Sequence, residues 1–176
     1  EFWEAFCDHN ADLNKEELYY DVWQFLDGKR GCDRLASLCL AGIKTATSSI
    51  YETFEIDDMK VPEAGDYSII LDSDETPLFI LKDTNVEIKK FSEIGEEFAE
   101  KEGEGDQSLE GWKKIHRKEF EAKCEEYGIE FSDEFWSIAD DSCYASEIRE
   151  IKKNYADEEK SEGETRNLID VAEEEG

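Results

Sequence analysis

Two apolar runs joined by a short polar connection constrain the fold of this chain more than any other feature. The runs are YSIILD at residues 67–72 and PLFILK at residues 77–82, with SDET between them. Short runs of β-branched and aromatic residues that flank turn-forming residues predict an antiparallel hairpin. A third run, VEIKKF at 86–91, follows almost at once and predicts another strand. We therefore expect a small antiparallel sheet in the middle of the chain.

Helical patterns precede this predicted sheet. Apolar residues recur at helical spacing in a short opening segment that stops near Asn10. A second pattern, DRLASLCLAG at residues 33–42, places its apolar residues on one face. Asp33 suits the N-cap of this helix, and Gly42 suits its C-terminal stop.

Helical patterns also follow the predicted sheet, which places the chain in the α+β class. SEIGEEFAEKEG at residues 92–103 predicts a short helix. Residues 108–128 predict a long one, because their apolar side chains recur at steps of three or four and Gly128 ends the pattern. Asp106 or Ser108 is expected to cap the long helix.

The charge of the chain limits its partners. Charged residues make up 39% of its 176 residues, and 48 acidic against 20 basic side chains give a net charge of -28. Such a field repels polyanions, so nonspecific binding to long nucleic acids or to an anionic membrane surface is disfavoured. An aromatic content of 12% indicates a folded globular protein rather than a disordered one. A basic protein is the kind of protein partner that such an acidic surface would attract.

The cysteine and histidine patterns indicate neither a metal site nor a cofactor. The five cysteines form no C-x-x-C pair, and the two histidines, His9 and His116, lie far apart in the sequence. An odd number of cysteines, no basic-then-apolar leader and no apolar run near ~20 residues predict a cytoplasmic protein that does not enter the membrane.

The segment GIKTATSS, residues 42–49, combines a lysine with small hydroxyl residues. A lysine desolvated in a pocket can act as a base, a neighbouring hydroxyl can then attack a carbonyl, and a carboxylate can orient the lysine. Lys44 and Thr47 would point to opposite faces of a regular strand, so they can cooperate only if the segment bulges or turns. Ser48 and Ser49 are interpreted as local backbone caps.

Three motifs occur in an order and spacing that resemble the ASCH domain family of the PUA-like superfamily. They are LAGIKTAT, GDYSIILD and FAEKEGEGDQSLEGWKKIH, and the resemblance covers about residues 3–136. It implies an α+β fold, a small PUA-like β-barrel with flanking helices. It also implies a cleft that holds RNA or a nucleoside.

The resemblance further implies roles for three residues. Family members that deacetylate modified cytidine use a lysine and a threonine from G-x-K-x-x-T and a glutamate from a downstream helix. Lys44, Thr47 and Glu102 occupy these positions. The leading hypothesis is a domain that binds RNA or a nucleotide in a cleft with these residues. A hydrolase using the same residues, either a nucleoside amidohydrolase or a ribonuclease, and an acidic protein-interaction module are the alternatives.

Six further residues are candidates for contacting the ligand, because they lie in or beside the family motifs or have rings that could stack on a base. They are Tyr20, Trp23, Thr45, Ser108, Trp112 and His116. A basic side of the segment WKKIHRK could receive phosphates, although such charges usually pair with nearby carboxylates. The glycine-bearing segment EGEGDQS is interpreted as a linker before the long helix rather than a metal or phosphate loop.

The C-terminal part departs from the family pattern. Relatives continue into a further strand, but the usual apolar run is absent after Trp136. We therefore expect the domain to cover residues 1–136 and an additional helical segment to cover 137–155. Residues 156–176 are predicted to be an acidic, mobile tail, because they offer little apolar surface to offset the cost of ordering.

Overall fold

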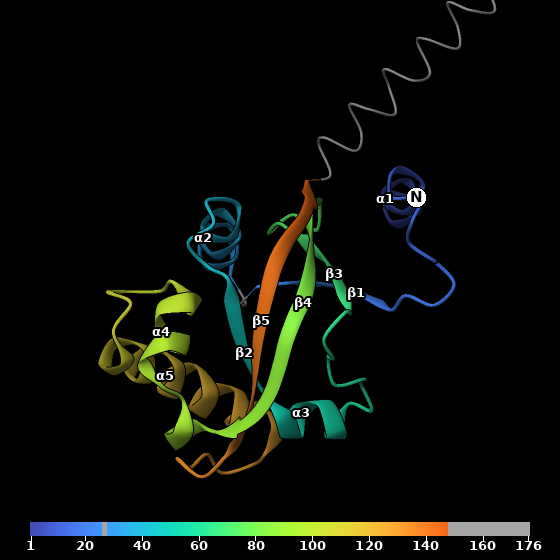
Figure 1. The fold of residues 1–176 in the computed structure, drawn as a ribbon. Helices are drawn as coiled ribbons and strands as arrows, with labels where there is room; N and C mark the ends of the chain where they lie inside the picture. The colour runs from blue at the N-terminus through green and yellow to red at the C-terminus, as the bar shows by residue number, and fades with distance from the viewer. Residues whose placement is uncertain (26–27, 148–176) are drawn as a thin grey trace, which may run out of the picture.

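A computed structural model describes residues 1–25 and 28–147 of the chain. Its centre is one five-stranded sheet in the order β1-β3-β4-β5-β2. β1 pairs with β3 in parallel, and the other neighbours are antiparallel. Figure 1 shows the long strands β4 and β5 side by side at the centre, with α1 on one side and α2, α4 and α5 on the other.

The strands and helices follow one another as a mixture typical of an α+β protein. The strands are β1 Tyr20–Gln24, β2 Ala46–Ile50, β3 Tyr67–Leu71, β4 Pro77–Lys90 and β5 Trp136–Glu147. The helices are α1 Phe2–His9, α2 Lys29–Leu40, α3 Tyr51–Ile56, α4 Glu96–Glu102 and α5 Leu109–Tyr127, with a 3-10 turn at Phe91–Glu93.

The predicted hairpin, opening helix and long helix are all present, but two details differ. Residues 86–91 do not form a separate strand, because most of them continue β4. Helix α2 begins at Lys29, four residues before the predicted cap. Asp33 instead accepts hydrogen bonds from the backbone and hydroxyl of Ser73, which ties α2 to the β3–β4 turn.

The predicted absence of a strand after Trp136 is wrong. Residues 136–147 form β5, which pairs with β4 on one side and β2 on the other, and they do not begin a helical segment. The acidic residues of this strand break the apolar pattern, although Ile138 and Ala139 are buried. The remainder of the helix predicted over 137–155, and the tail predicted over 156–176, lie outside the described residues.

The core lies on both sides of the sheet. Helix α1 packs Trp3 and Phe6 against one face of β3 and β4, while α2 covers the opposite face of these strands. Helix α5 packs Trp112 and Phe120 against Phe91. The hydrophobic cluster around Phe91 also contains residues of α4, β2 and β5. It therefore fixes α4 and α5 next to the segment that contains Lys44.

Two aspartates meet across the pairing of β4 with β5. Asp83 is buried and Asp140 is half-buried, and each carboxyl affects the pKa of the other. Burial raises the pKa of Asp83 to about 6, whereas burial and the neighbouring Asp83 raise the pKa of Asp140 to about 8. Since the pKa of Asp140 lies above 7, the pair holds a proton at neutral pH.

This pair should make the stability of the domain fall as the pH rises from about 4 to about 8. A carboxyl whose folded pKa is raised stabilises the fold at low pH and loses that contribution as the pH rises through the folded pKa. Asp140→Asn, which cannot ionise, should therefore raise the melting temperature less at pH 5 than at pH 9. At pH 9 it should raise the melting temperature by about 2 to 4 °C or more.

Thermal unfolding at the two pH values tests this expectation. Asp12→Asn, at an exposed position, is the matched control and should change neither melting temperature. Equal loss of stability for Asp140→Asn at both pH values would contradict it, because titration of the pair could not then be the cause.

Candidate functional site

The end of α2 directs Lys44 into the protein. Gly42 follows the helix with φ of 71°, a left-handed conformation that glycine adopts without strain. The backbone amides of Ile43 and Lys44 both donate to the carbonyl of Leu38, at 3.0 and 3.1 Å. This turn places Lys44 two residues before β2, where its side chain is 2% exposed.

The end of α4 approaches the same turn closely. Gly103 ends α4 in the left-handed conformation, and a β-carbon at Gly103 would lie 2.7 Å from the carbonyl oxygen of Ile43. The amide of Thr45 donates to the carbonyl of Lys101 at 2.7 Å. Glycine is therefore required at position 103, because only its missing side chain lets the two loops meet and brings Glu102 to Lys44.

Five side chains form a buried polar network, which we call the Lys44 centre: Lys44, Ser48, Glu102, Glu104 and His116. Lys44 Nζ donates to Glu102 Oε2 at 2.6 Å and to Glu104 Oε1 at 3.1 Å. The hydroxyl of Ser48 donates to Glu102 Oε1 at 2.5 Å. The network thus joins the α2–β2 turn, β2 and the loop between α4 and α5.

Helix α5 adds His116 to the centre. His116 Nδ1 donates to the carbonyl of Trp112 at 3.0 Å, which leaves Nε2 facing Glu102 Oε1 at 3.4 Å. The imidazole stacks on the indole of Trp112, with ring centroids 4.3 Å apart. Both rings are buried, so His116 is held in one orientation toward the carboxylates.

The charges of the centre stabilise one another. Burial alone would lower the pKa of Lys44, but Glu102 and Glu104 outweigh it and the pKa is raised. Burial alone would raise the pKa of Glu102, but Lys44 and His116 hold it well below its usual range. The pKa of His116 is raised, because Glu102 and Glu104 outweigh its burial. Lys44 is therefore an ammonium and Glu102 a carboxylate at neutral pH.

The same residues include a group of possible metal ligands. Oxygen atoms of Glu102 and Glu104 and a ring nitrogen of His116 all lie within 4.8 Å of one another. Lys44 Nζ, however, already contacts both carboxylates. A metal ion at this position would have to displace the ammonium, so the donor set suits the internal lysine as its cation.

The curl of the sheet brings the segment after β1 to the Lys44 centre. Phe25 directly follows β1, and Lys44 Nζ lies 5.7 Å from the centre of its ring. Trp23, which is half-buried, packs edge to face on Phe25 with centroids 4.8 Å apart. β1 and β2 are at opposite ends of the strand order. Phe25, which follows β1, nevertheless lies beside Lys44, which precedes β2.

The structure brings together two of the three residues assigned from the family pattern. Lys44 and Glu102 form the ion pair described above, but no contact of Thr47 with either is present in the described chain. Side chains alternate along β2, so Thr47 faces the side of Asp140, its partner in β5. Ser48 contacts Glu102 instead, and its interpretation as a backbone cap is wrong. The alternation of side chains along an extended segment would have indicated Ser48, because residues 44, 46 and 48 face the same side.

Glu104 and Arg34 were missed by sequence reasoning. Glu104 was grouped with the linker, yet its side chain is 4% exposed and bound to Lys44. Arg34, on α2, lies with Nη2 at 4.0 Å from Glu104 Oε2, and its own side chain is 55% exposed. Both residues lie in patterns that the sequence shows, but no local signal indicates that Arg34 and Glu104 meet.

The other predicted ligand-contacting residues have different environments. Tyr20 is exposed and stacks on Trp3, and Thr45 is exposed beside the Lys44 centre. Ser108 caps α5, as predicted, by accepting from the amide of Gly111 at 3.0 Å. Trp112 is 1% exposed, so its ring is part of the core and offers no free face to a ligand.

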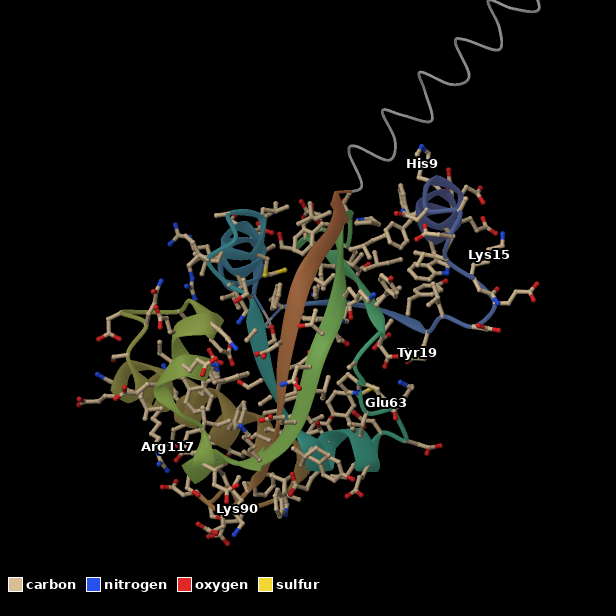
Figure 2. All side chains as sticks on the ribbon, viewed as in Figure 1. His9, Lys15, Tyr19, Glu63, Lys90 and Arg117 are labelled. Atoms are coloured by element: carbon tan, nitrogen blue, oxygen red, sulfur yellow. The ribbon has the colours of Figure 1, made fainter. Side chains whose placement is uncertain are left out.

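Arg117, on the basic side of α5, has both an acidic and an aromatic neighbour. Arg117 forms an ion pair with Asp133 at 2.6 Å and also lies 5.3 Å from the ring of Phe91. Figure 2 shows Arg117 and Lys90 at the periphery of the molecule. Lys90 pairs with Glu134 at 2.6 Å. This end of the molecule is therefore a mixed-charge surface rather than a cationic one.

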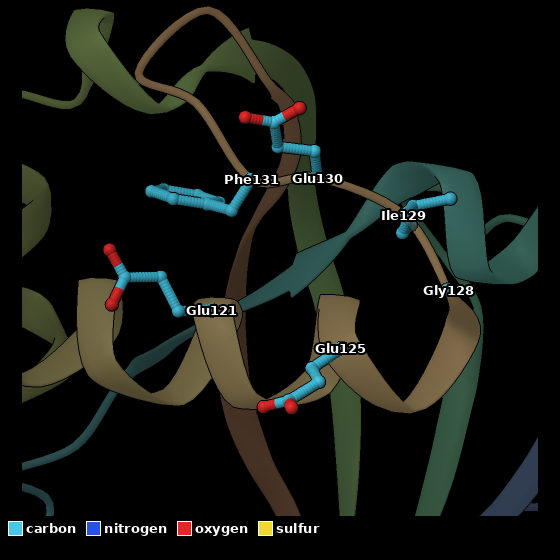
Figure 3. A pocket seen from close by; sticks show the side chains of 6 residues that line it. All are labelled: Glu121, Glu125, Gly128, Ile129, Glu130 and Phe131. Carbon is cyan, nitrogen blue, oxygen red and sulfur yellow. The ribbon is translucent and has the colours of Figure 1, made fainter.

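A shallow pocket lies at the C-terminal end of α5. Its lining is formed by Glu121, Glu125, Gly128, Ile129, Glu130 and Phe131 (Figure 3). None of these residues belongs to the Lys44 centre, and the three carboxylates would repel a phosphate. The pocket does not fit the nucleotide cleft implied by the sequence.

The curled five-stranded sheet with flanking helices defines an α+β domain of the PUA-like type. The family model for the ASCH domain matches residues 21–141, which include the Lys44 centre and the first half of β5. The chain therefore belongs to the ASCH domain family, as the sequence motifs predicted.

Two solved structures resemble the chain. A protein of Enterococcus faecalis V583 assigned to the family DUF984 is 31% identical, with a TM-score of 0.76 over 86% of this chain and 90% of that one. An ASCH domain from Lactobacillus crispatus JV V101 is 25% identical, with a TM-score of 0.73 over 82% of this chain and 94% of that one. No curated protein matches. Among the described residues, no helix combines the length and apolarity needed to cross a membrane.

The burial of the Lys44 centre predicts a large effect of removing its cation. Lys44→Met keeps most of the side-chain volume but leaves two buried carboxylates without their ammonium. The free energy of unfolding should fall by about 3 to 5 kcal/mol, measured by urea denaturation. The matched change Lys114→Met, at an exposed position of α5, should have an effect below about 0.5 kcal/mol. Similar losses in both variants would show that the centre contributes little to stability.

Proposed function

We propose that this ASCH domain binds an RNA-type ligand, a nucleoside or nucleotide, at the surface beside the Lys44 centre. The observation that carries this proposal is the protonation of the centre. Lys44 is held as an ammonium between Glu102 and Glu104, so it can orient and attract polar groups but cannot accept a proton. A lysine in this state supports binding better than general-base catalysis.

The surroundings of the centre supply groups that a nucleoside could contact. Ser48 is half-buried, and Thr45 and Arg34 are exposed around the buried ion pairs. The half-buried Trp23 lies next to Phe25, close to Lys44. Aromatic rings and fixed hydrogen-bonding groups together are typical of sites that bind single bases.

Charge favours a small ligand over a long RNA. The chain has a net charge of -28, and Arg117, one of the basic residues of α5, is paired with a carboxylate. Few phosphates could therefore be neutralised, so little counterion release would drive binding. A neutral nucleoside, or a single nucleotide at an RNA end, avoids this repulsion.

The cellular location that we propose is the cytoplasm. The cysteines Cys7, Cys32, Cys39 and Cys124 are free and buried. Burial raises the pKa of the Cys39 thiol to about 11, which keeps it protonated and unreactive. Free thiols of this kind fit a reducing compartment.

Binding should depend weakly on salt. We expect the affinity for neutral nucleosides, measured by calorimetry, to change less than about twofold between low and high ionic strength. Ser48→Ala should weaken binding about tenfold, since a hydrogen-bonding group beside the ion pair is lost. The double change Lys113→Ala with Lys114→Ala should have little effect. Tight, salt-sensitive binding of single-stranded RNA that the double variant loses would contradict this ordering, and no binding at all would favour the protein-interaction alternative.

One contact favours a hydrolase as the second candidate. The hydroxyl of Ser48 donates to Glu102 at 2.5 Å, the arrangement of a nucleophile beside its base. Against it, Lys44 and His116 hold the pKa of Glu102 below its usual range, which makes this carboxylate a weak base. The nucleophile of this candidate is Ser48 rather than Thr47, because only Ser48 contacts the carboxylate.

An acylated cytidine tests the second candidate. If the domain hydrolyses it, release of the acid should fall at least about a hundredfold in Ser48→Ala and be nearly unchanged in Thr47→Val. Ser48 and Thr47 are neighbours in β2, but their side chains lie on opposite faces of the strand, and only Ser48 is on the side of Glu102. Loss of turnover in Thr47→Val with full turnover in Ser48→Ala would restore the role implied by the family pattern and remove Ser48 from the reaction.

A further inference from the structure

Within the Lys44 centre, Glu104 differs from Glu102 in having a free oxygen. Both oxygens of Glu102 are engaged, by Lys44 and by Ser48. Glu104 Oε1 accepts from Lys44, but Glu104 Oε2 is buried and has no hydrogen-bond partner in the described part of the chain. A buried carboxylate oxygen without a donor is costly, so its position indicates a group that a ligand would supply.

The backbone fixes the direction of this oxygen. Glu104 lies between Gly103 and Gly105, which both adopt left-handed conformations with φ of 68° and 60°. Lys44 holds the other oxygen at 3.1 Å, so the carboxylate cannot rotate freely. The nearest cation on the side of Oε2 is Arg34, at 4.0 Å, which is too long for a hydrogen bond. Because the Arg34 side chain is more than half exposed, it can move aside for a ligand.

The charge balance of the centre selects the chemistry of that ligand. Two carboxylates face the Lys44 ammonium and His116, whose pKa is raised, so the centre has little surplus negative charge to attract a further buried cation. A phosphate would be repelled by the free carboxylate oxygen. A neutral N–H donor satisfies Oε2 without burying another charge.

We propose that Glu104 is a specificity-determining residue that accepts a hydrogen bond from the exocyclic amine of a nucleobase. Acidic side chains accept from the amine of cytosine, and the amine of adenine is a donor of the same kind. Uracil and hypoxanthine present a carbonyl oxygen at the corresponding positions, which the carboxylate repels. This inference rests on the proposed function, since it assigns a ligand class to the same site.

Lys44 makes a sharp test possible. In Glu104→Gln, the side-chain oxygen must face Lys44, because the ammonium has donors and no acceptor. The NH₂ group then occupies the position of Oε2. The site changes from an acceptor to a donor, so its preference should reverse rather than disappear.

The experiment measures the affinities of cytidine, uridine, adenosine and inosine for the full chain by calorimetry. The unaltered protein should bind cytidine about tenfold more tightly than uridine, and adenosine about tenfold more tightly than inosine. Glu104→Gln should bind the carbonyl member of each pair at least as tightly as the amino member. Glu110→Gln, an exposed change at the start of α5, is the matched control and should keep the original preference.

The outcomes separate the two proposals. Equal binding of both members of each pair by the unaltered protein, or an equal loss for all four nucleosides in a folded Glu104→Gln protein, overturns the role of Glu104 while nucleoside binding stands. Binding of none of the four overturns both proposals. Binding of Mn²⁺ that displaces a nucleoside would overturn the role of Glu104 as a base contact and make it a metal ligand.

Discussion

The ion pair between Lys44 and Glu102 is the interaction on which the arrangement of this domain most depends. It joins the turn after α2 to the end of α4, and both side chains are almost fully buried. Taking these charges out of water is tolerated only because Glu104, Ser48 and His116 complete the hydrogen bonding. The glycine at position 103 is a condition for the pair, since a larger residue would separate the two loops.

The same interaction is the basis of the proposal that the domain binds a ligand rather than hydrolyses it. A lysine that acts as a base must lose its proton easily, whereas Lys44 is stabilised as an ammonium by two carboxylates. This protonation state supports the proposed role of the centre in binding rather than in base catalysis. Ser48 and the free oxygen of Glu104 are the parts of this network that the internal contacts leave for a ligand.

Much of the fold could be predicted because its signals are local. The β3–β4 hairpin, the α5 pattern with Ser108 and the left-handed Gly42 each follow from residues adjacent in sequence. Strand β5 could not be found in this way, because Asp140 and its acidic neighbours interrupt the apolar pattern. Pairing on both sides stabilises this strand, and the shared proton with Asp83 makes a buried acid acceptable there.

The sequence by itself determined the α+β class, the family, and the presence of Lys44 and Glu102 in one site. Only the tertiary structure decided that Ser48 rather than Thr47 meets Glu102, because strand alternation is defined once β2 is paired. It also decided that Glu104 is buried beside Lys44. The tertiary structure also decided the protonation states of the centre. A pKa depends on burial and on nearby charges, and the charges beside Lys44 come from residues about 60 positions away in the sequence, which no local pattern records.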